Sequence, residues 1–293
     1  MKILIGIPAY NEEKNIGSII INLQKKYPNI LVCDDGSIDN TSEISKKLGA
    51  LVIKHQKNQG YGSAIKSIFN KAKEMECDIL ITFDADGQHR IEDIENILDL
   101  MNNSDADIVI GSRFLNSDKT LMPKYRKLGI KAITKFTNVL SGTKITDSQS
   151  GFRSYNKKIL ENITLTDDGM GISTEILIKS KEQGFKIRET PIVVNYDGDT
   201  STHNPVIHGT SVIISTLQFI SIQKPLTFYG IPGIIFFSIG LFFSVWAIQI
   251  FVEQNKLITN IALIGGISTI FGIILIISAS ILHSIVILIN SKR

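Results

Sequence analysis

Short apolar runs alternate with longer amphipathic stretches along most of the chain before residue 200. Apolar runs of about four to eight residues are typical of buried strands, and an apolar residue at every third or fourth position is typical of helices. The expected strands are Ile3–Ile7, Ile30–Cys33, Leu51–Ile53, Ile79–Phe83 and Ile108–Ile110, and the expected helices are Asn15–Lys26, Thr41–Leu48, Gly60–Lys73 and Ile91–Met101. This alternation predicts an α/β fold with a mostly parallel sheet and flanking helices.

The pattern is less regular after Gly111 and yields further elements. We expect a helix over Lys124–Leu140, a helix over Ser173–Gln183 that is capped by Ser173 or Thr174, and a late strand over Lys186–Tyr196. Residues 205–224 place polar side chains on one side of a helical pattern. They predict an amphipathic helix on a membrane surface, and the alternative is a helix packed on the core of a soluble domain.

Two long apolar segments follow. Phe228–Val252 and Ile261–Leu282 contain no charged residue, and each is long enough to cross a bilayer, which takes about 20 apolar residues. Only Glu253–Leu257 separates them, so we expect a transmembrane hairpin with helices over about 228–252 and 258–289. The alternative is a buried helical pair in a soluble protein. It is disfavoured because the segments are long and contain no charged residue.

The charges around the hairpin predict its orientation. Lys224, Lys292 and Arg293 at its outer ends outnumber Lys256 in its loop, and basic residues favour the cytoplasmic side. We therefore expect an integral protein of the cell membrane with a cytoplasmic domain over 1–204, an interfacial helix over 205–224 and the hairpin over 225–293.

Charge also bears on the class of partner. The formal net charge is +3, and no segment gathers Lys and Arg into a continuous patch with aromatic residues between them. A nucleic-acid-binding protein normally has such a patch. The sequence therefore predicts no nucleic-acid partner.

Asp84 and Asp86 directly follow an expected strand. Alternate residues of an extended segment lie about 6–7 Å apart on one face, so both carboxylates can share a divalent metal ion. Gln88 continues the alternation and offers a neutral oxygen, and such ligands suit Mg²⁺ or Mn²⁺ better than zinc. The alternative is a pair of solvated turn residues.

Other polar clusters fall at the carboxyl ends of strands, where ligands of open α/β sheets bind. The turn that contains Asp35 and Gly36 offers a carboxylate for the N–H of a base or the hydroxyls of a ribose, and the glycine permits close backbone approach. An ordinary Asp-Gly turn is the alternative. Arg113 and Arg126 suit phosphate recognition, or are surface salt-bridge partners.

Six segments in order resemble glycosyltransferase family 2, whose fold is called GT-A. They are Ile7 to Glu13, Val32 to Ser37, Asn58 to Gly62, Phe83 to His89, Gly111 to Phe114 and Asp147 to Arg153. Within that family the chain is similar to dolichyl-phosphate and polyprenyl-phosphate hexose synthases, particularly archaeal ones, over roughly residues 1–225.

The resemblance implies a role for each matching residue. Those implied to hold the nucleotide and its diphosphate are Pro8, Tyr10, Glu12, Asp35, Gly36 and Asp84; those for Mg²⁺ or Mn²⁺ are Asp84, Asp86 and Gln88; those for the acceptor phosphate are Arg113, Arg126 and Ser150. Asp86, Arg113 and Arg126 are the implied catalytic residues.

The implied reaction is inverting transfer of a hexose from a UDP- or GDP-linked sugar to dolichyl or polyprenyl phosphate. No residue resembles a dedicated general base, and an anionic phosphate acceptor needs none. The alternatives are a glycolipid synthase acting on a lipid hydroxyl and a non-catalytic sugar-nucleotide sensor. A processive synthase is disfavoured, because such enzymes have a Gln-x-x-Arg-Trp motif and the only tryptophan here is Trp246. The sequence does not determine which sugar is transferred, whether the nucleotide is UDP or GDP, or whether the chain forms a homo-oligomer.

Overall fold

The structure is a computed structural model of the whole chain, and it describes all residues except 116–121, 123, 195–220, 222–224, 257 and 292–293. The chain divides into two compact units, Met1–Thr216 and Leu217–Arg293. Apart from Ser221, the expected interfacial helix over 205–224 lies outside the described residues.

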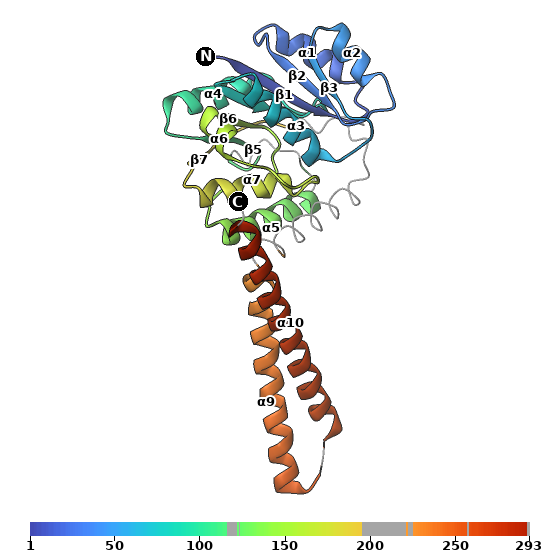
Figure 1. Cartoon of the computed structure of the whole chain (residues 1–293), viewed down its shortest axis with the longest axis vertical. Coiled ribbons are helices and arrows are strands. Elements are labelled where there is room, and N and C mark those ends of the chain that lie inside the picture. The colour runs from blue at the N-terminus through green and yellow to red at the C-terminus, as the bar shows by residue number, and fades with distance from the viewer. Residues whose placement is uncertain (116–121, 123, 195–220, 222–224, 257, 292–293) are drawn as a thin grey trace. The chain divides into compact units, whose positions relative to one another are not determined.

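A seven-stranded sheet with the order β3-β2-β1-β4-β6-β5-β7 forms the centre of the first unit (Figure 1). Its strands are β1 (Ile3–Ala9), β2 (Ile30–Asp34), β3 (Leu51–Lys54), β4 (Ile79–Thr82), β5 (Ile108–Ser112), β6 (Arg153–Asn156) and β7 (Ile187–Pro191). Of the strands in the described part of the chain, only β6 runs antiparallel to its neighbours, β4 and β5. The mostly parallel sheet predicted from the sequence is therefore confirmed.

Two of the sequence predictions about strands differ from the structure. Strand β6 was missed because Arg153–Asn156 has no apolar run; its side chains are nevertheless mostly buried. The late strand was predicted over Lys186–Tyr196, but β7 ends at Pro191, because the N–H of Val193 donates to the carboxylate of Asp93 at 3.0 Å and not to a neighbouring strand. Residues 195 and 196 of that prediction lie outside the described residues.

The helices of the first unit connect these strands. They are α1 (Ile16–Gln24), α2 (Thr41–Lys47), α3 (Tyr61–Glu74), α4 (Asp93–Asn103), α5 (Lys124–Ser141), α6 (Lys157–Asn162) and α7 (Ile172–Glu182). The predicted cap of α7 is wrong. The capping position is Gly171, and Ser173 and Thr174 are buried within the first turn of the helix.

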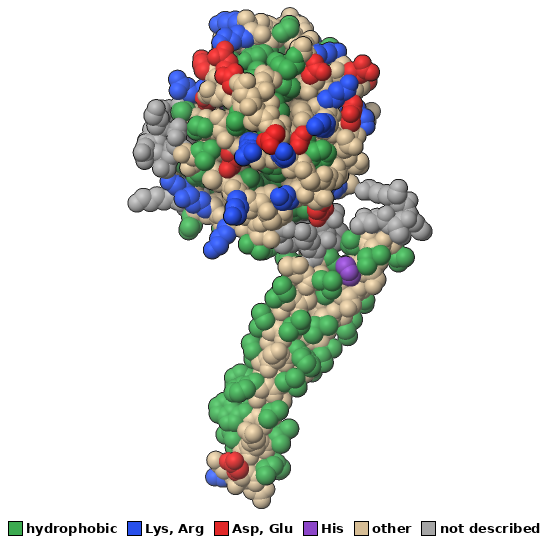
Figure 2. All heavy atoms as spheres, turned by 90° about the vertical axis from the view of Figure 1, so that its left-hand side faces the viewer, with side chains coloured by type: hydrophobic (Ala, Val, Ile, Leu, Met, Phe, Trp, Pro, Cys, Tyr) green, Lys and Arg blue, Asp and Glu red, His purple; other side chains and the backbone are tan. Residues whose placement is uncertain are grey.

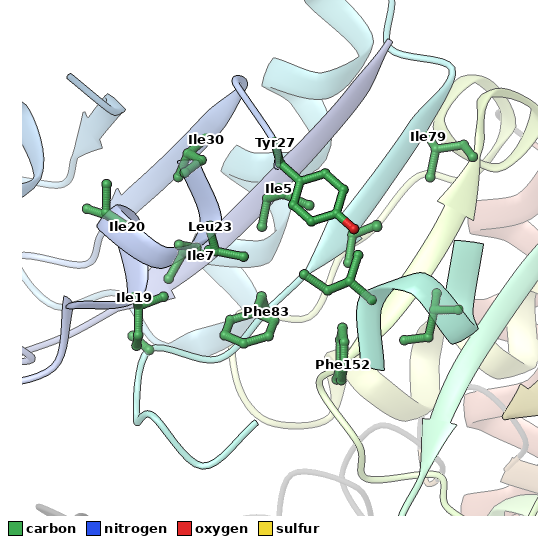
Figure 3. Close-up of a cluster of buried hydrophobic side chains, with 14 of the residues drawn as sticks. Ile5, Ile7, Ile19, Ile20, Leu23, Tyr27, Ile30, Ile79, Phe83 and Phe152 are labelled. Carbon is green, nitrogen blue, oxygen red and sulfur yellow. The ribbon is translucent and has the colours of Figure 1, made fainter. Parts of the chain in front are cut away.

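The sheet is covered on both faces, and the alternation of side chains along each strand decides which face each residue joins. On one face, Ile5 and Ile7 of β1 pack with residues of α1 and α4 around Phe83 and Phe152 (Figure 3). On the other, Leu4 packs with residues of α3, α6 and α7. The first unit is therefore a three-layer α/β domain.

The second unit is a helical hairpin. It consists of a short η2 turn (Leu226–Gly230), α9 (Ile231–Gln254) and α10 (Thr259–Ser291). Both helices are long and apolar enough to cross a membrane, and Figure 2 shows many apolar side chains along the hairpin, with the charged side chains that the structure describes there at the end that carries the loop between α9 and α10. These properties fit a transmembrane hairpin.

Small residues line the contact between α9 and α10. They are spaced seven apart on each helix, at Gly233, Gly240 and Ala247 and at Gly265, Gly272 and Ala279. A Cβ atom on Gly240 would lie 2.8 Å from the Cα of Thr269, and one on Gly272 would lie 2.8 Å from the Cα of Phe237. Small residues at such spacing let helix backbones approach closely, as in membrane helix pairs.

Candidate functional site

The loops after β1 and β2 are bound to each other at the carboxyl edge of the sheet. The backbone N–H of Asp35 donates to Ala9 at 2.9 Å, and that of Asn11 donates to Ser37 Oγ at 2.9 Å. Asn11 has a positive φ of 56°. The N–H of Glu12 donates to Thr41 Oγ1 at 2.8 Å. The two expected nucleotide-binding segments are therefore joined into one surface.

Asp35 is held by three donors within this surface. Its Oδ1 accepts from His55 Nδ1 at 2.6 Å and from the N–H of Gln59 at 3.0 Å. Its Oδ2 accepts from the N–H of Gly60 at 2.8 Å. Gly36 lies directly against the same segment, since a Cβ on it would be 2.5 Å from the carbonyl carbon of Lys57. Only glycine fits this turn.

Asp84 follows β4 and is surrounded by cationic and polar groups. Its Oδ2 accepts from His89 Nε2 at 3.1 Å. Burial opposes its ionisation, but the hydrogen bond from His89 and the charges of Arg113 and Arg153 hold the pKa of Asp84 below its usual value. A Cβ on Gly151 would lie 2.6 Å from Asp84 Oδ1. This carboxylate is therefore ionised and closely confined.

Asp86 and Gln88 lie beside it in the same loop. The N–H of Gln88 donates to Asp86 Oδ1 at 2.9 Å. Burial raises the pKa of the nearby Glu12 to about 7, and a hydrogen bond from Asn15 opposes this rise. The negative charges of Asp86 and Asp84 raise the pKa of Glu12 further. The site thus concentrates negative charge, which a bound cation would relieve.

The residues fit a hard divalent cation whose remaining ligands come from a substrate. Among the described residues, no group of three or more His, Cys, Asp or Glu side chains is arranged to hold a metal ion. The chain therefore offers two carboxylates and one amide. Mg²⁺ is usually bound by one or two carboxylates together with substrate phosphates.

Arg113 is fixed by a two-pronged ion pair with Asp147. Its Nε and Nη2 donate to the two carboxylate oxygens at 2.6 and 2.8 Å, and its backbone N–H donates to Oδ2 at 3.2 Å. Both residues are buried. Burial opposes ionisation of Asp147, but Arg113 holds the pKa of this carboxyl below its usual value.

Arg153 is a buried cation that ties the segment 148–153 to α7. Its guanidinium donates to the carbonyls of Ser148, Ser150 and Ser173 at 2.7, 2.8 and 3.0 Å. The Ser150 hydroxyl is buried and has no hydrogen-bond partner among the residues that the structure describes. A buried unpaired hydroxyl is costly unless a ligand satisfies it.

The segment 58–62 is packed under the loop before α7. The buried Glu175 accepts from the backbone of Thr166 and Asp167, each at 2.8 Å, and the hydroxyl of Ser63 donates to Asp168 at 2.6 Å. A Cβ on Gly62 would lie 2.7 Å from the carbonyl carbon of Asp168. The glycine is therefore required by backbone contact.

We expect Gly62→Ala to destabilise the first unit by about 1–3 kcal/mol, because the added methyl group meets immovable backbone atoms. Thermal unfolding in detergent measures the effect. Gly129→Ala is the matched control: it lies in α5, where no described atom is within 4 Å of the added Cβ, and it should be neutral or stabilise by up to about 1 kcal/mol. Equal melting temperatures for both variants would contradict the close contact.

The structure brings together the described residues singled out from the sequence. Pro8 and the half-buried Tyr10 lie at the end of β1 and just beyond it. The side chain of Arg126, in the first turns of α5, lies outside what the structure describes. Sequence reasoning did not assign roles to His55, Tyr61 or His89, although Tyr61 and His89 stand in two of the six motifs.

Comparison with known proteins decides the family. The profile of Glycosyl transferase family 2 matches residues 4–164. The chain belongs to glycosyl transferase family 2. The family predicted from the sequence is thus confirmed, and the matched region contains all of the described site residues.

Several relatives cover most of the chain. A UDP-N-acetylglucosamine–dolichyl-phosphate N-acetylglucosaminyltransferase of Methanococcus voltae is 36% identical over 233 residues, which cover 72% of this chain and 91% of that protein. A dolichyl-phosphate hexose transferase of Haloferax volcanii is 32% identical over 206 residues, covering 70% and 87%. A dolichol-phosphate mannosyltransferase of Pyrococcus furiosus is 35% identical over 202 residues, covering 65% and 56%.

Solved structures agree on the fold. The crystal structure of glucosyl-3-phosphoglycerate synthase from Mycobacterium tuberculosis, which contains Mn²⁺ and UDP, matches with a TM-score of 0.56 and 19% identity, covering 74% of this chain and 79% of that one. Together with the family, this shows that the first unit has the GT-A fold, a mixed sheet with flanking helices.

Proposed function

We propose that this protein transfers a hexosyl group from a nucleotide sugar to a polyprenyl phosphate, such as dolichyl phosphate, with inversion at the anomeric carbon. The observation that carries the proposal is the acidic loop of Asp84 and Asp86 beside two buried arginines at the carboxyl edge of a family 2 sheet. Relatives named as dolichyl-phosphate transferases support the choice of acceptor.

In this proposal the donor lies across the joined loops of β1 and β2. Asp35 receives a donor group of the base or ribose, and Pro8, Tyr10, Glu12 and Gly36 border the nucleotide. Asp84, Asp86 and Gln88 would hold Mg²⁺ or Mn²⁺, which when bound supplies positive charge to the departing diphosphate. A protein of the same fold has been crystallised with Mn²⁺ and UDP, which supports the use of a divalent ion in general.

The acceptor phosphate needs no general base. Its second pKa is near 6, so most of it carries a nucleophilic oxygen anion at neutral pH. That oxygen forms the new bond to the anomeric carbon while the bond to the nucleoside diphosphate breaks. Arg113, oriented by Asp147, and Arg126 attract the phosphate, and the unpaired hydroxyl of Ser150 donates a hydrogen bond to it.

Helix α5 supports action at a membrane surface. Leu128 and Val139 are 72% and 73% exposed, and their separation of eleven positions places both on one side of the helix, about 20° apart. The exposed Lys131 and Lys135 lie near this stripe. Exposed apolar residues beside lysines are typical of surfaces that contact anionic lipid.

A change of Leu128→Glu and Val139→Glu together should raise the KM for a long-chain polyprenyl phosphate in vesicles about tenfold, because the stripe then repels the headgroups. The KM for a short-chain, water-soluble prenyl phosphate should not change. Ile21→Glu, at a half-exposed isoleucine of α1, is the control and should alter neither. An equal effect on both acceptors would contradict a membrane-facing role.

The experiment that tests the function is a donor and acceptor screen. Purified protein in detergent is incubated with Mg²⁺ or Mn²⁺, polyprenyl phosphate and each radiolabelled UDP- or GDP-sugar in turn. We expect one donor to give an acid-labile lipid product, as a sugar phosphodiester is. Transfer to diacylglycerol but not to polyprenyl phosphate would instead indicate a glycolipid synthase.

A further inference from the structure

The carboxylate of Asp35 has few hydrogen-bonding positions left. An ionised carboxylate has about four lone-pair sites, two on each oxygen. His55 Nδ1 and the N–H of Gln59 fill both sites of Oδ1, and the N–H of Gly60 fills one of Oδ2. One site, on Oδ2, is left. The side chain is only 6% exposed, so water cannot rearrange freely around it.

The ring of His55 is itself held by hydrogen bonds at both of its nitrogen atoms. Because Asp35 can only accept, Nδ1 of His55 carries a proton, and in the neutral ring Nε2 accepts from the hydroxyl of Ser67 at 2.9 Å. The thiol of Cys33 lies 3.7 Å from Nε2. Burial raises the pKa of the Cys33 thiol to about 12, and the charge of Asp35 adds to the effect. The thiol therefore stays neutral and places no negative charge beside His55.

The backbone donors are fixed equally well. Gly60 has a φ of 100°, and its missing side chain leaves room for the carbonyl of Asp168. The N–H groups of Gln59 and Gly60 are thus held toward Asp35 by the loop before α7. The fold itself therefore keeps three of the hydrogen-bonding positions of Asp35 occupied.

Nucleobases differ in what they offer to such a carboxylate. Guanine presents two adjacent donors, N1–H and the N2 amino group, which pair with both oxygens of a carboxylate. Uracil presents one donor, N3–H, between two carbonyl oxygens. With Oδ1 already filled, guanine would leave one of its two N–H donors without an acceptor on Asp35, whereas the single N3–H of uracil would pair with Oδ2.

We infer that Asp35 accepts one N–H from uracil, that the donor is therefore a UDP-sugar rather than a GDP-sugar, and that His55 is the positioning residue that sets this preference. The inference rests on the proposed function for the placement of the nucleotide at Asp35. It goes further by choosing the base and by giving a role to a residue outside the six motifs.

The test is calorimetric titration of the full-length protein in detergent and saturating Mg²⁺ with UDP and with GDP. We expect UDP to bind at least about tenfold more tightly than GDP, the effect of one unpaired buried donor. His55→Phe should weaken the binding of UDP and reduce the ratio of UDP affinity to GDP affinity. The reason is that Oδ1 loses the hydrogen bond from His55, so the Asp35 side chain can rotate. His55→Asn keeps an N–H near the position of Nδ1 and should retain most of the preference.

Two further variants make the outcomes distinct. Asp35→Asn should weaken the binding of UDP at least about tenfold. His283→Phe makes the same substitution in the hairpin and should change the affinity for neither UDP nor GDP. Equal or tighter binding of GDP by the native protein would overturn the inference, as would equal weakening of both nucleotides by His55→Phe, the mark of a purely structural histidine. A native protein that prefers GDP yet still glycosylates polyprenyl phosphate would leave the proposed function standing. Failure to bind any nucleotide would overturn both.

Discussion

Asp86→Ala is expected to lower sugar transfer at least about a thousandfold, since a metal ion at a leaving group stabilises the transition state by several kcal/mol and each 1.4 kcal/mol is about a factor of ten. Asp86 lies in a loop beside β4, half-buried, so the fold should survive its removal. Initial rates with saturating donor and polyprenyl phosphate measure the loss, and circular dichroism checks the fold.

Three controls sharpen this result. Asp86→Asn keeps an acceptor for the N–H of Gln88 but loses the charge, so it should fail almost as badly. Asp99→Ala removes an exposed carboxylate from α4 and should leave the rate unchanged. Excess EDTA should abolish transfer by the native protein, and added Mn²⁺ should restore it. A folded Asp86→Ala protein that works at the native rate would refute the metal assignment.

Asp147→Ala is expected to destabilise the first unit by about 3–5 kcal/mol, because removing one partner of a buried ion pair leaves the other charge unpaired. Asp147 is fully buried and Arg113 is 9% exposed. For a domain of this size the loss corresponds to a fall of roughly 10 °C in melting temperature. Transfer should also fall, since Arg113 loses the group that orients it.

The double variant Arg113→Met with Asp147→Leu separates stability from activity. It removes both charges and should recover much of the lost stability, yet it should remain inactive. If the single Asp147→Ala variant melts at the native temperature, the ion pair does not stabilise the fold.

The effect of Asp147 should also depend on pH. Because its pKa is lower in the folded protein than in the unfolded chain, its stabilisation is present above the unfolded value of about 3.9 and is lost as pH falls through the folded value. The difference in melting temperature between native protein and Asp147→Ala should therefore shrink below about pH 4.

The strands with apolar runs could be predicted from the sequence, because a buried strand in a covered sheet must be apolar on both faces. Strand β6 could not, since the buried guanidinium of Arg153 donates hydrogen bonds to the carbonyls of Ser148, Ser150 and Ser173, which are brought together only by folding. The start of α7 was misjudged for a similar reason: Ser173 and Thr174 have the right chemistry for a cap but are buried by α7 packing on the sheet.

The candidate site divides in the same way. Asp35, Asp84 and Asp86 were recognisable because they lie in the loops after β2 and β4, and the carboxyl ends of parallel strands meet at one edge. His55 lies outside the six motifs and Asp147 opens one of them, but the role of each became clear only from its partner, which is 20 and 34 positions away in the chain. No local pattern marks a histidine that fills a lone pair of a distant carboxylate.

The sequence by itself determined the family, the sheet edge that carries the acidic loop, and two helices able to cross a membrane, because motif order and apolar length are local properties of the chain. Only the tertiary structure decided how many hydrogen bonds Asp35 can still accept and which charge orients Arg113. Those properties depend on geometry between distant segments, and the inferred choice of uracil over guanine rests on them.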